Sequence, residues 1–72
     1  MERFTAIIER DGDVYVALCP ELDIASQGHS VEEARTNLVE ALTLFFEVAE
    51  PPEIDRRLSG QAFITQVEVP VG

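Results

Sequence analysis

Hydrophobic and polar positions alternate along the first part of the chain, which is the pattern of half-buried β-strands. Within residues 3–9, the side chains of Phe4, Ala6 and Ile8 share one face. A second alternating run covers residues 14–18, and the Asp-Gly pair between the two runs suits a tight primed turn. The pattern predicts an antiparallel hairpin.

A third, shorter strand is expected after the hairpin. Pro20 ends the second run because its ring nitrogen cannot donate to a β-ladder. The run from Ile24 to Gln27 is short and follows this break, and Gly28 and His29 then turn the chain.

A long helix follows the three strands. Ser30 to Glu33 has the form of a capping box, in which the Ser30 hydroxyl accepts from the Glu33 amide and the Glu33 carboxylate accepts from the Ser30 amide. We expect the helix to run from Val31 to about Glu50, where Pro51-Pro52 stop it.

The remainder of the chain predicts two small elements. Residues 53–60 suit one helical turn ending at Gly60, and Ala62 to Val69 alternate again as a last strand that Pro70 ends. The sequence therefore predicts one α+β domain over residues 1–72, with two layers and the order β-β-β-α-β.

The apolar arc of the helix is wider than one packed face requires. A stripe suited to packing on the sheet is extended by Val39 and Phe46 on one flank and by Leu44 and Val48 on the other. The stripe consists of Ala34, Leu38, Ala41, Leu42, Phe45 and Ala49.

The sheet shows a similar excess, since a helix on one face leaves the other face open. We expect the open face to carry Ile7, Tyr15, Ala17 and Ile64, or else the residues that alternate with them. An exposed apolar face often marks an interface, although a monomer with a few exposed apolar residues is also normal. The candidate residues for an oligomer or partner interface are Val39, Phe46, Tyr15 and Ile7.

Size and composition favour a homodimer or higher oligomer. A chain of 72 residues buries little surface alone, and its single cysteine and single histidine exclude an internal disulfide or a Cys/His zinc cluster.

No apolar run is long enough to span a membrane, and the N-terminus has no basic, apolar signal pattern. We expect a cytoplasmic protein in which Cys19 stays reduced.

Fourteen acidic residues against five arginines, with no lysine, give a net charge of −9. This charge repels phosphate backbones, so no direct contact with nucleic acid is expected, and it favours a basic partner. The alternative is that the charge only maintains solubility.

No combination of residues predicts catalysis, a cofactor or a metal site. His29 precedes a helix and has no nucleophilic side chain nearby, so a role in a turn is expected. Cys19 is expected to act as a small buried apolar residue. Glu40 and Glu47 share a polar strip that is typical of a solvated helix face, and the glycines are too scattered for a phosphate loop.

Four stretches of the chain together resemble the HicB-like antitoxin family over residues 3–47. They are Cys19-Pro20-Glu21-Leu22, Ala25-Ser26-Gln27-Gly28, Ser30-Val31-Glu32-Glu33-Ala34, and Asn37-Leu38 with Glu40-Ala41-Leu42. The sequence departs from the family pattern at Asp23-Ile24, where Pro-Gly is common, and at His29, where an acidic residue is common.

The resemblance implies a partial RNase H-like fold with strand order 3-2-1-4, in which a right-handed crossover makes the last strand parallel to the first. It also implies a protein that binds and blocks a small basic toxin that cleaves mRNA. The family's C-terminal DNA-binding segment and the carboxylates of true RNase H have no counterpart here, so neither activity is expected. The alternatives are a solitary oligomeric interaction or regulatory module without a toxin, and a metal-dependent nuclease.

Overall fold

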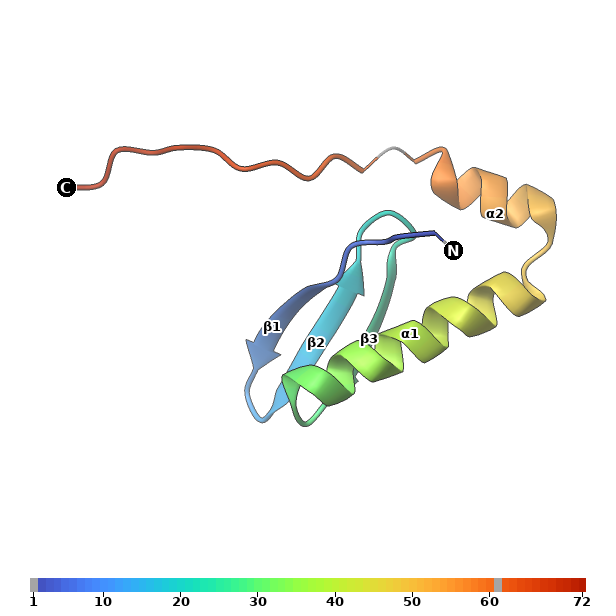
Figure 1. Cartoon of the computed structure of the whole chain (residues 1–72), viewed down its shortest axis with the longest axis horizontal. Coiled ribbons are helices and arrows are strands. Elements are labelled where there is room, and N and C mark those ends of the chain that lie inside the picture. The colour runs from blue at the N-terminus through green and yellow to red at the C-terminus, as the bar shows by residue number, and fades with distance from the viewer. Residues whose placement is uncertain (1, 61) are drawn as a thin grey trace.

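A three-stranded antiparallel sheet and two helices make up the computed structural model, which describes residues 2–60 and 62–72 (Figure 1). The strands lie side by side in the order β1-β2-β3, and α1 crosses one face of the sheet. The elements are β1 (Ile7–Asp11), β2 (Val14–Cys19), β3 (Ile24–Gly28), α1 (Val31–Val48) and α2 (Pro51–Leu58). The predicted α+β class and the first three strands are confirmed.

The hairpin between β1 and β2 has a two-residue loop. Its register pairs Ile7 with Leu18 at one end and Asp11 with Val14 at the other. The loop is therefore Gly12-Asp13, in which Gly12 alone has a positive φ, of 63°. This is the pattern of a type II′ turn, with glycine first in the loop rather than second.

The first turn of α1 is capped by side chains. The Ser30 Oγ accepts from the Glu33 amide at 3.0 Å, as predicted, but the Glu33 carboxylate accepts from the His29 amide at 3.0 Å rather than from that of Ser30. The helix ends at Val48, just before the two prolines. These prolines occupy the first two positions of α2, where their missing N–H groups cost no hydrogen bond.

The N-terminal turn of α1 lies directly against β3, and glycine permits this contact. A Cβ atom on Gly28 would come within 2.6 Å of the Ala34 nitrogen and 2.8 Å of the Glu33 carbonyl carbon. A second link is made by Asn37, whose Nδ2 donates to the Gln27 carbonyl oxygen at 2.7 Å. The strand and the helix are thus joined by close packing and by a hydrogen bond.

The core lies between α1 and the sheet and is small. Half-buried Phe4, Ile8, Tyr15, Ile24, Leu42 and Phe45 surround it. The fully buried apolar residues are Ala17, Cys19, Leu22, Ala34 and Leu38. The predicted helix stripe is confirmed, since Ala34 and Leu38 are its most buried members.

The sheet face away from α1 carries Ile7, Val16 and Leu18, which line a hollow of about 250 Å³ with Glu9. Tyr15 and Ala17 belong to the other face, because they alternate with Val16 and Leu18 along β2. The expectation that Ile7, Tyr15 and Ala17 share one face was therefore wrong.

The predicted last strand is also wrong for this structure. Residues 62–72 are extended and exposed but form no β-ladder, so the expected order 3-2-1-4 is not formed. Figure 1 shows this segment leaving α2 and passing over one end of the sheet instead of turning along β1. Alternation along a sequence indicates which faces are apolar, but a strand also needs a neighbouring edge.

Neither of the helices among the described residues combines the length and the apolar character that crossing a membrane requires.

Substituting Gly28 by Ala should lower the free energy of unfolding by about 1–3 kcal/mol, because the new methyl group would overlap the backbone of α1. Urea unfolding followed by circular dichroism measures this. The control is His29→Ala at the exposed neighbouring position, which should change stability by less than about 0.5 kcal/mol. Equal stability of the two variants would show that the close contact is not required.

Candidate functional site

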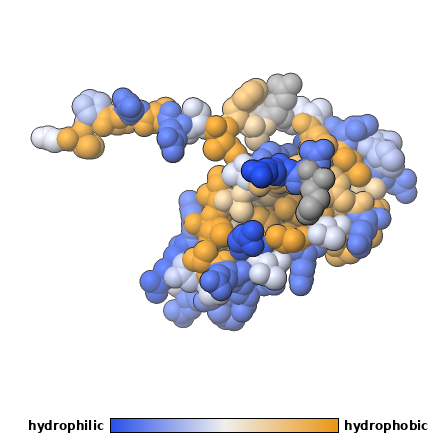
Figure 2. Space-filling view, viewed as in Figure 1, coloured by the Kyte–Doolittle hydropathy of each residue, from blue (hydrophilic) through white to orange (hydrophobic). Residues whose placement is uncertain are grey.

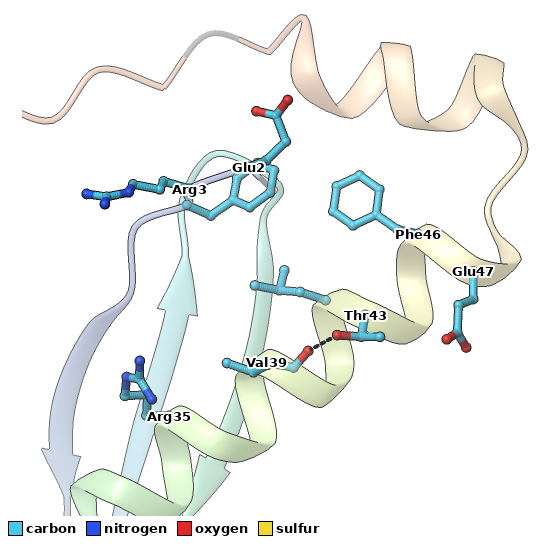
Figure 3. Close-up of a pocket in the computed structure, with 9 residues that line it drawn as sticks. Glu2, Arg3, Arg35, Val39, Thr43, Phe46 and Glu47 are labelled. Atoms are coloured by element: carbon cyan, nitrogen blue, oxygen red, sulfur yellow. Dashed lines mark hydrogen bonds between the residues drawn. The ribbon is translucent and has the colours of Figure 1, made fainter.

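An open groove runs between the N-terminal segment and one flank of α1 (Figure 3). Its volume is about 890 Å³, and we call it the α1 groove. The N-terminal segment contributes Glu2, Arg3 and Phe4 to its walls. The helix contributes Arg35, Val39, Leu42, Thr43, Phe46 and Glu47, which recur at helical spacing along one side of α1.

Aromatic rings close one end of the α1 groove. The ring of Phe46 stacks on that of Phe4, with centroids 5.6 Å apart and an interplanar angle of 27°. Phe45 meets Phe46 edge to face at 5.3 Å and also packs against the core. Figure 3 shows Phe46 pointing across the groove towards the N-terminal segment, so this contact holds that segment over the helix.

Along the helix wall, the floor of the groove is apolar. Val39 is 50% exposed and Leu42 is half-buried against the core. The Thr43 hydroxyl donates to the Val39 carbonyl oxygen at 2.7 Å, which satisfies its polar group within the helix. An apolar side chain entering the groove would therefore meet hydrocarbon and no unsatisfied hydroxyl.

The charged side chains of the groove balance one another. Glu2 and Glu47 oppose Arg3 and Arg35, so the lining has no formal net charge in a chain of net charge −9. Arg3 points away from α1 and Glu47 points away from the groove (Figure 3). The α1 groove is thus an apolar and nearly neutral surface on an acidic protein.

The N-terminal wall is held in place by the loop between β2 and β3. The Thr5 amide donates to Glu21 Oε2 at 2.9 Å, and the Cys19 thiol donates to Glu21 Oε1 at 3.6 Å. Burial opposes ionisation of Glu21, but hydrogen bonds from its own amide, from Thr5 and from Cys19 together lower its pKa. The charged carboxylate therefore ties the segment preceding β1 to the loop.

The thiol of Cys19 is structural in character. Its side chain is fully buried, and this burial, together with the nearby Glu21 carboxylate, raises its pKa. Since the thiolate is the reactive form, a raised pKa disfavours nucleophilic chemistry.

The same loop also receives α2. Arg57 Nη1 donates to the Leu22 carbonyl oxygen at 2.9 Å, and its Nε donates to Glu53 Oε1 at 3.2 Å. The Arg57 guanidinium lies 5.5 Å from the centroid of the Phe45 ring, a cation–π contact. These contacts dock α2 against the body of the protein and set where the chain beyond it begins.

Two of the four predicted interface residues come together, and two do not. Val39 and Phe46 both line the α1 groove. Ile7 is 39% exposed on the opposite face of the sheet, whereas Tyr15 is half-buried against the core. The sequence analysis missed Phe4 because its position depends on the course of the N-terminal segment, although its Phe46 partner was identified.

The residues considered for catalysis are not assembled into a site. Among residues 2–60 and 62–72, no three side chains of the His, Cys, Asp and Glu types come together as a metal-binding group. His29 is exposed in the turn before α1, where only its backbone amide is used, to bond Glu33. Glu40 and Glu47 are both exposed.

No family model matches the chain, and neither a curated protein nor a solved structure matches it. The HicB-like resemblance therefore depends on the residues alone. Each of its four short stretches has a structural role here: Glu21 and Leu22 order a loop, Gly28 permits close packing, Ser30 caps α1, and Asn37 bonds β3 while Leu38 lies in the core.

Replacing Glu21 by Gln should destabilise the protein most at neutral pH. A carboxyl whose folded pKa is lowered stabilises the folded state above its ordinary pKa, and this contribution is lost as the pH falls through the folded pKa. The difference in unfolding free energy between wild type and variant should therefore shrink on acidification. Urea titrations at several pH values measure it, with Glu40→Gln, an exposed carboxyl, as the control.

Replacing Arg57 by Ala should release α2 from the loop, because the bond to the Leu22 carbonyl and the contact with Phe45 are both lost. Amide hydrogen exchange in α2 should then accelerate several-fold while exchange in α1 stays slow. Arg56→Ala is the matched control, because Arg56 is 73% exposed and its ion pair is with Glu53 alone. Equal exchange in the two variants would contradict the docking role.

Proposed function

We propose that this chain is a HicB-like, antitoxin-type binding protein that neutralises a small basic mRNA-cleaving toxin by direct contact in the cytoplasm. The observation that carries the proposal is the surplus of exposed acid. Fourteen acidic residues face five arginines in the sequence, and the ion pairs among the described residues join Glu53 to Arg56 and Arg57. Most carboxylates thus remain available to a cationic partner.

The resemblance supports the same proposal. Its residues are used for folding, and three of the four strands that it implies are present in the expected order. A partial RNase H-like plan belongs to the proposal, without the fourth strand, which the described residues of this structure do not form. Complementary charge would speed the encounter with a basic toxin and would cover the surface that the toxin uses for RNA.

One end of the sheet carries a surplus of negative charge, although Arg10 also lies there with its Nε donating to the Gly12 carbonyl oxygen. The loop at Gly12-Asp13 lies beside the start of α1, because the register pairs Tyr15 with Gly28 at this end. The exposed carboxylates here are those of Asp11, Asp13, Glu32 and Glu33. We call these four residues the acidic end and propose that it meets the toxin first.

The test is whether a small basic protein is encoded next to this gene and whether this chain inhibits mRNA cleavage by it; a gene without such a neighbour would rule the proposal out. An equimolar amount of the full chain should abolish mRNA cleavage, and the association rate should fall steeply with added NaCl. The triple variant Asp11→Asn, Asp13→Asn, Glu32→Gln should lower that rate about ten-fold, since steering depends on local charge.

The matched control is Glu40→Gln, Glu47→Gln and Glu68→Gln, which removes the same charge elsewhere. If added protein leaves cleavage unchanged, toxin neutralisation is ruled out. If both triple variants lower the association rate equally, the total net charge of the chain sets that rate, and the position of the carboxylates at the acidic end has no effect on it.

The α1 groove favours a second candidate function, that of a solitary oligomeric interaction or regulatory module. An apolar, neutral groove does not suit a basic toxin, but it suits another protein surface. Self-association without any effect on the toxin would favour this candidate.

A further inference from the structure

The C-terminal segment, residues 62–72, has the pattern of a strand but no partner. Its odd-numbered positions are mostly apolar and highly exposed: Phe63 is 85%, Val67 80% and Val71 91% accessible. Glu68 carries the segment's single side-chain charge. Figure 2 shows this apolar surface running along the segment away from the body. An extended apolar segment without a covering element marks an interaction surface.

The sheet offers one uncovered edge to such a segment. β3 is bridged by α1 through Asn37 and Gln27, so its edge is partly occupied. β1 is the other edge strand, and no described element pairs with its outer side. The outward amides and carbonyls of β1 are therefore free to accept another strand.

The α1 groove lies on the helix side of this same edge. Its walls join the segment preceding β1 to the flank of α1 that carries Val39 and Phe46. A strand added beside β1 would direct every second side chain towards this flank. The apolar odd-numbered face of the C-terminal segment matches the apolar floor of the groove.

In this structure the C-terminal segment does not pair with its own β1. Docking of Arg57 on the Leu22 carbonyl fixes α2 at the loop between β2 and β3. From there the segment passes over the end of the sheet and continues outward (Figure 1). Its eleven residues span about 36 Å when extended, against about 17 Å for the five of β1, which is ample reach for a neighbouring molecule.

We propose that the C-terminal segment of a second copy of this chain pairs with β1 and lays its odd-numbered side chains in the α1 groove. The exchange is reciprocal, so each copy gives one segment and receives one. A two-fold dimer results, in which both sheets gain a fourth strand from the partner. This proposal holds whether or not the chain binds a toxin.

Charge and size favour a second copy as the occupant. Two copies of net charge −9 repel each other overall, but the local repulsion is weakest where both surfaces are nearly neutral, as the groove and the segment are. A standard interface uses roughly 20–30 residues a side. Eleven residues of the segment, five of β1 and nine around the groove reach that size.

Multi-angle light scattering on the full chain tests the proposal. The wild type should have twice the monomer mass of 8.0 kDa. Val67→Asp should be monomeric, because it places a charge in the groove, while its helical circular dichroism stays unchanged because the segment lies outside the core. Val39→Asp should also be monomeric, because it places a charge in the groove that receives the partner's segment.

Gln66→Asp and Val48→Asp are the matched controls and should remain dimeric. Gln66 points to the other side of the segment, and Val48 is 70% exposed outside the groove. Amides of the C-terminal segment should be protected from hydrogen exchange at high protein concentration and lose protection on dilution.

Three results would overturn the proposal. They are a monomeric wild type, a dimer that survives Val67→Asp, and segment protection that does not depend on concentration, as when each segment folds onto its own β1. Whether the chain inhibits a toxin does not affect these outcomes. A failure of the dimer proposal can therefore be distinguished from a failure of the proposed function.

Discussion

The close contact between β3 and the first turn of α1 determines the arrangement of the whole domain. Because Gly28 has no side chain, the backbone of the helix approaches the strand at a distance that a Cβ atom would prevent. This approach seats Ala34 and Leu38 on the sheet and leaves the flank with Val39 and Phe46 turned towards the N-terminal segment. The α1 groove is thus a consequence of how the helix is placed.

Local signals in the sequence predicted the elements whose partners are close in the chain. The hairpin, the third strand and the Ser30 cap depend on residues a few positions apart, and all were confirmed. Two neighbouring prolines correctly ended α1, but they also begin α2, which reaches Leu58 and was expected to be shorter. A proline pair indicates that one helix stops, but it is equally compatible with a loop or with the first turn of another helix.

Long-range placement was harder to predict. The alternation of residues 62–69 showed two faces but could not show whether an edge would be within reach. Likewise, the helix pattern identified Val39 and Phe46, whereas the opposite wall with Phe4 depends on the Glu21 carboxylate holding the amide of Thr5. Tyr15 and Ile7 were expected on one surface, but the alternation of side chains along the paired strands places them on opposite faces of the sheet.

The distribution of arginine has a consequence for how the chain would be trimmed by proteases. All five arginines precede residue 58, and residues 62–72 contain neither arginine nor lysine. A trypsin-like enzyme would therefore find no cleavage site within this stretch, however accessible it is. Enzymes that cut after aromatic or small aliphatic residues would meet Phe63 and several valines there. Digestion by a trypsin-like enzyme would thus report on the domain body alone, whereas the second class would also meet Phe4, Tyr15, Phe45 and Phe46 in the body.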